Sequence, residues 1–422
     1  MPTYLKQKEP QAAADVSRVP AAVTEMLERV RREGDPAVRH FSRQFDGWDP
    51  PSFRVSTDEI HRASASLSES LKADIAFAQA QVRRFAEAQR ARLQDFEIET
   101  LPGVTLGQRC IPVGSAGAYV PGGRYPLIAS AYMSVLTAKV AGVARVIACT
   151  PPRAGQGIHP PTLHAIATSG ADEIYCLGGV QALAAMAYGT ESIRPVDFLA
   201  GPGNAYVAEA KRQLFGQVGV DLVAGPSEVL IIADDTADPS IVAADLLAQA
   251  EHDPDAVAVL ITISRDIGEH VLMEIERQLA ELPTQAVAGA SWRANGQVVV
   301  VKDDEAAVAL ADEHASEHVH VLTRDPEWYR QRLRNYGSLF LGSETTVAYG
   351  DKAVGTNHIL PTSRAARHTG GLWVGRYIKV VTYQRLTKEG SVQIAPITAN
   401  ICRAEEMIGH AIAAELRLAE YR

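Results

Sequence analysis

The feature that most constrains this 422-residue chain is a regular alternation of apolar runs and amphipathic segments from Val104 onward. Short glycine-bounded apolar runs predict buried strands, and the amphipathic segments between them predict helices. Strands that alternate with helices at this spacing favour a parallel sheet with helices on both faces. The chain is also long for a single hydrophobic core. We therefore predict an α/β protein with two Rossmann-like lobes and small helical segments at its ends.

The alternation falls into two series, with the ligand site expected where the two lobes meet. The first series predicts strands at 116–120, 143–149, 173–177 and 196–199, and helices at 130–141, 163–169, 182–188 and 205–215. The second predicts strands at 229–233, 257–262, 298–301, 319–322 and 338–341, and helices at 241–251, 267–279 and 306–312. Apolar residues also recur at helical spacing between residues 20 and 95, and residues 399–421 predict one helix.

Charge and cysteine usage exclude several classes of partner. Fifty acidic residues against 41 basic ones give a formal net charge of -9, which argues against a nucleic-acid or anionic-membrane surface as the main partner. The four cysteines form no Cys-x-x-Cys pair, so we expect buried free thiols. There is no apolar stretch typical of a signal peptide and no apolar run long enough to span a bilayer. We expect a cytoplasmic protein.

Two polar pairs are candidates for chemistry. Gln249 and His252 are three residues apart in a predicted helix, and this spacing suits two ligands of one metal ion. Taken on its own, this pair is more simply explained as a polar helix end. Glu317 and His318 open a predicted strand, where a carboxylate beside an imidazole offers a proton shuttle near neutral pH. A solvated polar turn is the alternative explanation of that pair.

Glycine-rich loops mark further candidate sites. The segment 350–358 carries Asp351, Asn357 and His358, an acid, an amide and an imidazole in one loop. Other glycine loops lie at 117–123, 177–181, 201–204 and 225–227, where strands of the first series end or the next begins. Such loops let the backbone approach a nucleotide closely. None reads Gly-x-Gly-x-x-Gly, so the ordinary dinucleotide-binding motif is absent.

Taken together and in order, these segments resemble the histidinol dehydrogenase family from about residue 15 to the end. The matching stretches are GAYVPGGR, AKVAGV, GGVQALAAMAYGTESI, GPGNAYVAEAKR, GQVGVDLVAGPSEVLIIAD, DLLAQAEHD, ASEHV, GDKAVGTNHILPT and AEEMIGH. The resemblance implies Zn²⁺ and NAD⁺ as cofactors and an intertwined homodimer. It also implies dimerisation segments at 1–14 and 373–422, a zinc-binding catalytic domain at 15–118 and 228–372, and an NAD-binding domain at 119–227.

The resemblance implies a role for each candidate residue. The zinc ligands would be Gln249, His252 and Asp351, with His410 supplied by the partner subunit. The acid–base pair would be Glu317 and His318, the NAD contacts Tyr119, Gln181 and Asn204, and the substrate contacts Ser227, His358 and Glu405. His318 would take the hydroxyl proton as hydride leaves for NAD⁺, and Glu317 would then activate a water against the bound aldehyde.

The substrate end of the pocket departs from the pattern of the family. Residues 371–379 read GLWVGRYIK, where the family has roughly Gly-Leu-Ser-Val followed by an acidic residue and Phe. This resembles the branch that includes sulfopropanediol 3-dehydrogenase, which oxidises 2,3-dihydroxypropane-1-sulfonate to sulfolactate. A basic residue in place of an acidic one suits a sulfonate anion. The candidate anion contacts are Arg367, His368, Arg376 and Lys379, with solvated surface charges as the alternative.

Two other functions stay open. Glu405, which the family uses toward the imidazole of histidinol, is retained, and this favours histidinol itself as the substrate. The second alternative is a non-catalytic paralogue that binds metal or nucleotide. The intact Glu317–His318 pair and the four proposed ligands argue against it.

Overall fold

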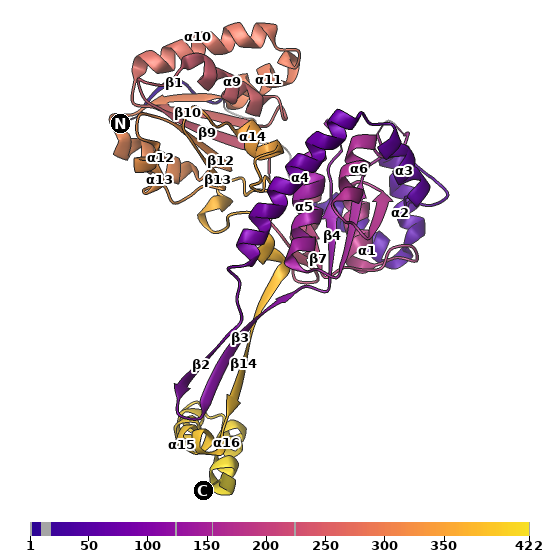
Figure 1. Cartoon of the computed structure of the whole chain (residues 1–422), viewed down its shortest axis with the longest axis vertical. Coiled ribbons are helices and arrows are strands. Elements are labelled where there is room, and N and C mark those ends of the chain that lie inside the picture. The colour runs from indigo at the N-terminus through magenta and orange to yellow at the C-terminus, as the bar shows by residue number, and fades with distance from the viewer. Residues whose placement is uncertain (1, 10–17, 123–124, 154, 223–224, 422) are drawn as a thin grey trace.

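The computed structural model describes residues 2–9, 18–122, 125–153, 155–222 and 225–421. Two α/β lobes lie side by side, and a thin antiparallel ribbon ending in two helices extends away from them (Figure 1). Each lobe is built on its own parallel sheet, with helices on its faces. The predicted architecture of two Rossmann-like lobes is confirmed.

The first lobe contains a five-stranded parallel sheet with strand order β6-β5-β4-β7-β8. Its strands are β4 (Ser115–Tyr119), β5 (Arg145–Thr150), β6 (Glu173–Cys176), β7 (Phe198–Ala200) and β8 (Gly219–Val220). Its helices are α5 (Ile128–Ala141), α6 (Pro160–Thr168), α7 (Gly179–Tyr188) and α8 (Ala205–Leu214). The strand order reverses at β4, and ligands of such sheets bind outside the carboxyl ends of the strands at this point.

The second lobe contains a six-stranded sheet with strand order β1-β11-β10-β9-β12-β13. Its strands are β1 (Thr3–Lys6), β9 (Glu228–Ala233), β10 (Val257–Thr262), β11 (Gln297–Val300), β12 (His318–Leu322) and β13 (Ser338–Leu341). Its helices are α9 (Pro239–Ala250), α10 (Arg265–Glu281), α11 (Gln285–Asn295), α12 (Asp304–His314), α13 (Pro326–Arg330) and α14 (Val347–Lys352). Apart from the antiparallel edge strand β1, the order matches that of the first lobe.

Both faces of the second sheet are buried. Alternate residues of β9 belong to separate apolar clusters: Val229 and Ile231 pack with residues of α9 and α10, whereas Leu230 and Ile232 pack with residues of α12 and α13. Because side chains of a strand alternate between its faces, a strand buried on both sides is apolar along its whole length. This is why these strands are recognisable in the sequence as continuous apolar runs.

The N-terminal helices correct the predicted domain boundary. The helices α1 (Arg18–Glu33), α2 (Asp35–Phe41), α3 (Thr57–Ala65) and α4 (Glu69–Arg90) pack mainly on the five-stranded lobe. Leu27 shares a cluster with Leu183 of α7, and Val82 shares another with Leu136 of α5. Assigning 15–118 to the lobe of 228–372 is therefore wrong, because helical spacing specifies a buried face but not the sheet that buries it.

The segment predicted at 1–14 is described only in part. Residues 3–6 form β1, which pairs with β11 of the same chain. Residue 1 and residues 10–14 lie outside the described ranges. The role of this segment in a dimer therefore stays a prediction.

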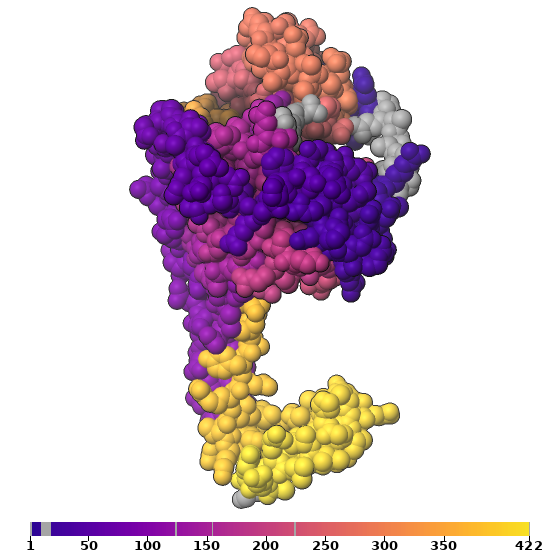
Figure 2. Space-filling model, turned by 90° about the vertical axis from the view of Figure 1, so that its right-hand side faces the viewer, coloured from indigo at the N-terminus to yellow at the C-terminus, as the bar shows by residue number. Residues whose placement is uncertain are grey.

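The ribbon is a three-stranded antiparallel sheet of β2 (Phe96–Leu101), β3 (Val104–Pro112) and β14 (Ile378–Leu386). β14 pairs with β3 along its whole length, from Ile378 opposite Pro112 to Leu386 opposite Val104. The ribbon leads to α15 (Lys388–Ala404) and α16 (Ile408–Tyr421), which form a helical hairpin that we call the foot. Figure 2 shows the foot standing clear of the two lobes.

The foot corrects the prediction of one helix at 399–421. The chain turns between α15 and α16, where Glu406 has a φ of 58° and the Met407 N–H donates to the Cys402 carbonyl at 2.8 Å. A left-handed residue with such a hydrogen bond ends a helix. The turn lets Ala399 and Cys402 pack against Ala411. Residues 373–422 are also not helical throughout, because they include β14.

Two expectations from composition can be compared with the structure. All four cysteines are buried free thiols, as predicted. Within the ranges that the structure describes, none of the helices combines the length and the apolar character needed to cross a membrane.

Candidate active site

The candidate site lies where the carboxyl edge of the five-stranded sheet meets the amino edge of the six-stranded sheet. The Ser130 hydroxyl, at the start of α5, lies 2.8 Å from Nε2 of His358 in the loop after α14. The Tyr125 hydroxyl donates to the Glu251 carbonyl, just past the end of α9, at 3.2 Å. These contacts join the loop after β4 and the start of α5 to the end of α9 and the loop after α14 in the other lobe. Two lobes therefore contribute side chains to one region.

Glu317 and His318 lie at the amino end of β12, beside the start of β9. Their exposed fractions are 6% and 3%. Oε2 of Glu317 accepts hydrogen bonds from the Ser227 hydroxyl at 2.6 Å and from the Glu228 N–H at 2.9 Å. The two side chains are 3.6 Å apart, from Oε2 of Glu317 to Nδ1 of His318. The predicted acid–base pair is thus a buried contact held by neighbouring groups, and the solvated turn is excluded.

The orientation of the His318 ring is fixed by the backbone. Its Nδ1 lies 2.9 Å from the carbonyl oxygen of Glu228, which can only accept, so Nδ1 carries a hydrogen. Its Nε2 is buried, has no hydrogen-bond partner among the described residues, and lies 3.6 Å from Oδ1 of Asp351. The free nitrogen therefore points toward the proposed metal ligand.

Burial and charge set the proton affinities of this cluster. Burial raises the pKa of Glu317 to about 7. Burial lowers the pKa of His318, but the carboxylates of Glu317 and Asp351 outweigh it and raise the value to about 9. Burial also acts to raise the pKa of Asp351, and the neighbouring His318 outweighs it and holds that pKa far below its usual range. The cluster can exchange protons near neutral pH.

Two of the proposed zinc ligands, His252 and Asp351, lie close together, and a third, Gln249, precedes His252 by three residues. Gln249 lies in the last turn of α9, His252 follows the end of that helix, and Asp351 lies in α14. His252 Nε2 is 3.9 Å from Asp351 Oδ2. The Gln249 side chain is buried, and its Nε2 finds no hydrogen-bond partner in the described part of the chain. Burial lowers the pKa of His252, which favours the neutral imidazole that binds metals.

One chain supplies only part of a coordination sphere. Across the described ranges, no group of three or more His, Cys, Asp or Glu side chains could hold a metal ion. The three residues nevertheless offer an imidazole nitrogen, a carboxylate and an amide oxygen, a donor set that zinc accepts. An additional ligand is required to complete it.

The three proposed NAD contacts share the carboxyl edge of the five-stranded sheet. Tyr119 ends β4, and its buried hydroxyl accepts from the Gly179 N–H at 3.2 Å. Gln181 lies in the first turn of α7 and donates to Asp46 at 3.0 Å. Asn204 caps α8 by accepting from two N–H groups of its first turn. Tyr119 and Asn204 follow the two strands at which the strand order reverses, where dinucleotides bind in such sheets.

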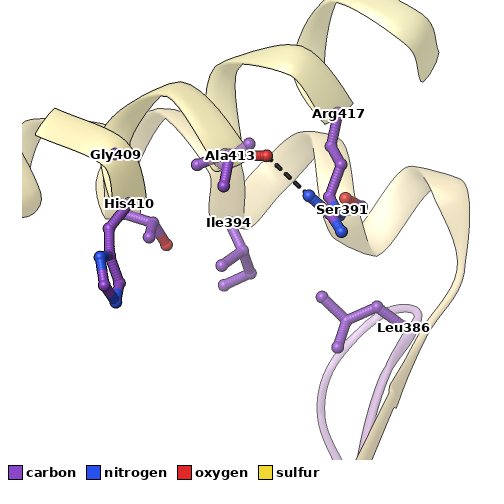
Figure 3. Close-up of a pocket in the computed structure, with 10 residues that line it drawn as sticks. Leu386, Ser391, Ile394, Gly409, His410, Ala413 and Arg417 are labelled. Carbon is purple, nitrogen blue, oxygen red and sulfur yellow. Dashed lines mark hydrogen bonds between the residues drawn. The ribbon is translucent and has the colours of Figure 1, made fainter.

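The proposed substrate contacts divide into two groups. Ser227 holds Glu317, and His358 lies with its Nδ1 2.9 Å from the Asp351 carbonyl oxygen. Burial lowers the pKa of His358 to about 4. Glu405 and His410 lie on the foot, away from the other residues (Figure 1). Figure 3 shows His410 on the rim of an apolar pocket between α15, α16 and β14. Within one chain these two residues do not join the site.

The proposed anion contacts are not gathered in one place either. Arg376 donates to the Thr369 hydroxyl and, at 3.5 Å, to the Gly371 carbonyl. Lys379 is exposed on β14, and Arg367 and His368 are exposed in the loop before it. None of these contacts joins them to Glu317, so their role stays a prediction.

Glu228 is a functional position that the sequence reasoning missed. Its N–H binds Glu317 and its carbonyl orients His318, while its own half-buried side chain accepts from the Ser363 N–H at 2.8 Å. Burial raises the pKa of this carboxyl. The available signal was a charged residue at the head of a strand that is otherwise buried on both faces.

Comparison with known proteins identifies the family of this chain. The family model described as histidinol dehydrogenase matches residues 9–418. The chain is 56% identical to a histidinol dehydrogenase homolog from Shouchella clausii, over 100% of both chains, and 49% identical to sulfopropanediol 3-dehydrogenase from Ruegeria pomeroyi, over 99% of this chain and 96% of that one. The crystal structure of histidinol dehydrogenase from Elizabethkingia anophelis superimposes with a TM-score of 0.92 at 36% identity, covering 98% of this chain and 94% of that one. With this match along nearly its whole length, the chain belongs to the histidinol dehydrogenase family of oxidoreductases.

Proposed function

We propose that the protein is a zinc- and NAD⁺-dependent dehydrogenase that oxidises a primary alcohol through a bound aldehyde to the carboxylate. The observation that carries this proposal is the buried Glu317–His318 pair, whose free imidazole nitrogen points at Asp351. The residues suited to bind a dinucleotide lie on the facing edge of the other lobe. In this arrangement His318 would accept the proton of the alcohol, and NAD⁺ bound at the facing edge would accept the hydride.

The two oxidation steps divide between the two residues. The Glu228 carbonyl fixes Nδ1 of His318, so Nε2 of the deprotonated ring takes the hydroxyl proton while hydride leaves for NAD⁺. Because the pKa of His318 is about 9, this deprotonated form, and with it the alcohol step, is favoured as the pH rises toward that value. Glu317, held by Ser227, then takes a proton from the water that adds to the aldehyde, and the hydrate so formed transfers a second hydride to a second NAD⁺ to give the carboxylate. A pKa of about 7 leaves Glu317 able to accept that proton at neutral pH. Bound Zn²⁺, held by Gln249, His252 and Asp351, would supply a Lewis acid for the substrate oxygen.

The remaining zinc ligand is proposed to be His410 of the partner subunit in a homodimer. The foot has a very small core of its own, Ala399, Cys402 and Ala411. It exposes large apolar side chains at Ile397, Ile401, Met407, Ile408, Ile412 and Leu416, and the ribbon exposes Phe96, Ile98, Leu101, Val380, Val381 and Tyr383. Exposed apolar side chains in this number on one extended element are typical of an interface. Docking of the foot on a second copy would cover it and carry His410 and Glu405 to a site.

For the substrate we propose 2,3-dihydroxypropane-1-sulfonate. The chain is 49% identical to the sulfopropanediol 3-dehydrogenase and 36% identical to the histidinol dehydrogenase of known structure. Basic residues also stand at 376 and 379, in the stretch that departs from the family pattern. Histidinol is the second candidate substrate, because Glu405 is retained.

A substrate comparison with the purified protein tests this proposal. NADH formation is measured with the sulfonate diol and with histidinol, before and after dialysis against a chelator and again after zinc is restored. We expect zinc-dependent turnover of the sulfonate diol and little turnover of histidinol. Turnover of histidinol alone would assign the substrate to histidine synthesis. Activity that survives complete removal of zinc would refute the metal requirement.

A further inference from the structure

Three elements that carry the proposed metal and acid–base residues are also connected by a second set of polar side chains. Helix α9 carries Asp245 one turn before Gln249. Strand β12 carries His320 two residues after His318, so both rings lie on the same face of the sheet. Helix α14, which carries Asp351, begins at its N-cap Thr346.

These three side chains meet in the interior. His320 Nδ1 is 3.1 Å from Asp245 Oδ2, and Asp245 Oδ1 accepts from the Thr346 hydroxyl at 2.8 Å. The other ring nitrogen of His320, Nε2, lies 3.0 Å from the carbonyl oxygen of Gly342. The His320 side chain is 0% exposed and that of Asp245 is 11% exposed. One buried imidazole thus links α9, β12 and the segment that begins α14.

The partners of the two ring nitrogens of His320 show which hydrogens its contact with Asp245 requires. Nε2 of His320 faces a carbonyl oxygen, which only accepts, so Nε2 carries a hydrogen. Nδ1 faces a carboxylate oxygen, so the contact is attractive only with a second hydrogen between the two atoms. Neither Nδ1 nor Oδ2 has an aligned hydrogen-bond partner among the described residues, so their 3.1 Å charge contact is the interaction that matches them. Removing one partner of such a buried pair costs free energy, because the other is left without an interaction. The proposed reaction steps do not involve His320 or Asp245.

The ring of Phe340 on β13 holds the two histidines in place. Its centroid is 5.9 Å from that of His318 and 6.2 Å from that of His320. A displacement of His320 would therefore be transmitted to His318 through a shared neighbour as well as through the strand. Gln249 and Asp351 lie on α9 and α14, which the contacts of His320, Asp245 and Thr346 connect, so their positions also depend on this pair.

We propose that Asp245 and His320 are positioning residues that hold Gln249, His252 and Asp351 in the geometry needed to bind zinc. The inference rests on the proposed function, because it assigns these three residues to a metal. It predicts that the pair acts on metal affinity and on kcat. It also predicts little effect on the KM for NAD⁺, because the dinucleotide edge belongs to the other sheet.

The test compares two substitutions of the same residue in the metal-free dimer. Asparagine places its amide nitrogen near the position of Nδ1, so His320→Asn keeps a donor toward Asp245. Glutamine reaches the position of Nε2, so His320→Gln keeps only the bond to Gly342. Zinc affinity is measured by competition with a chromophoric chelator. We expect His320→Gln and Asp245→Asn to bind zinc about 10-fold more weakly, with His320→Asn close to the wild-type protein.

A matched control separates positioning from general stability. Tyr329→Phe removes the hydrogen bond of 2.5 Å from the Tyr329 hydroxyl to Asp304, in the same lobe but at the opposite edge of the sheet. We expect it to lower the melting temperature and leave zinc affinity unchanged. Equal zinc affinity in wild type, His320→Gln and Asp245→Asn would overturn this inference alone, as would a matching loss in Tyr329→Phe. A wild-type protein that binds no zinc would overturn the proposed function with it.

Discussion

The two sheets share one strand order but present opposite edges to the candidate site. The five-stranded sheet contributes its carboxyl edge, with Tyr119 and Asn204 at the point where the order reverses. The six-stranded sheet contributes its amino edge, with Glu317 and His318. Two sheets of the same topology therefore carry their candidate functional residues at opposite edges. Topology alone does not determine which edge contributes to the site.

Side chains explain the difference. At the carboxyl edge of the six-stranded sheet, Asp234 follows β9 and accepts from the N–H groups of Arg324 at 2.7 Å and Thr236 at 2.9 Å. Its carboxylate thus uses the backbone donors that a ligand would need at this edge. At the carboxyl edge of the other sheet, β7 is followed by Gly201, which approaches the Tyr119 backbone too closely for any Cβ. We call the edge with Asp234 the closed edge. The other, which carries the proposed NAD⁺ contacts Tyr119 and Asn204, we call the open edge, although Asp221 accepts from the Gly201 N–H there at 2.8 Å.

The largest expected effect is on kcat, from a substitution at the amino edge of the six-stranded sheet. His318→Asn should lower kcat for the alcohol by about 100- to 10,000-fold, because the base that takes the hydroxyl proton is lost. Zinc content should stay at the wild-type level, since His318 is not a proposed ligand. NADH formation and metal analysis check the two halves of this prediction. Normal alcohol oxidation by the variant would show that the amino edge is not the catalytic one.

The next effect is a pH dependence of the aldehyde step. Glu317 acts as a base only when deprotonated, so with a pKa of about 7 the rate of aldehyde oxidation should rise through neutral pH and level off above it. Glu317→Gln should lose this rise and slow the step by about 100-fold. Steady-state rates on the aldehyde between pH 5.5 and 9 (roughly two units to either side of neutrality) give the profile. An unchanged profile in the variant would assign the ionisation to another group.

A smaller effect is expected at the open edge. Gly201 has a φ of 121°, and a Cβ there would collide with the Tyr119 carbonyl. Gly201→Ala should lower the free energy of unfolding by about 1–3 kcal/mol and weaken NADH binding, measured by urea unfolding and NADH fluorescence. Gly216→Ala is the matched control, because Gly216 has a φ of 95° but nothing within 4 Å of an added Cβ. Equal losses of NADH binding in both variants would remove the special role of the open edge.

The smallest effect is expected at the closed edge. Asp234→Asn replaces one acceptor oxygen with an NH₂ group that cannot accept from a backbone N–H. The free energy of unfolding should fall by about 1 kcal/mol, with kcat and the KM for NAD⁺ unchanged. Thermal or urea unfolding and steady-state kinetics provide the measurements. A change in the KM for NAD⁺ would mean that the closed edge also takes part in binding.

Much of the fold was predictable because burial leaves a periodic trace. Strands at 257–262 and 338–341 were predicted with the bounds that the structure has, since each is an apolar run between polar turns. The Glu317–His318 pair was also recognisable, as two titratable residues at the head of such a strand. The helices before residue 95 were predicted as helices but assigned to the wrong lobe, because an amphipathic pattern does not identify its partner.

The sequence by itself determined the two α/β lobes, the order of their elements and the residue types available for chemistry. These follow from hydrophobic periodicity and local turn chemistry, which act over a few residues. Only the tertiary structure decided which edge of each sheet faces the other lobe, that Glu228 orients His318, and that the foot turns at Glu406. These depend on contacts between segments far apart in the chain, such as Ser227 with Glu317, and no local pattern records such contacts.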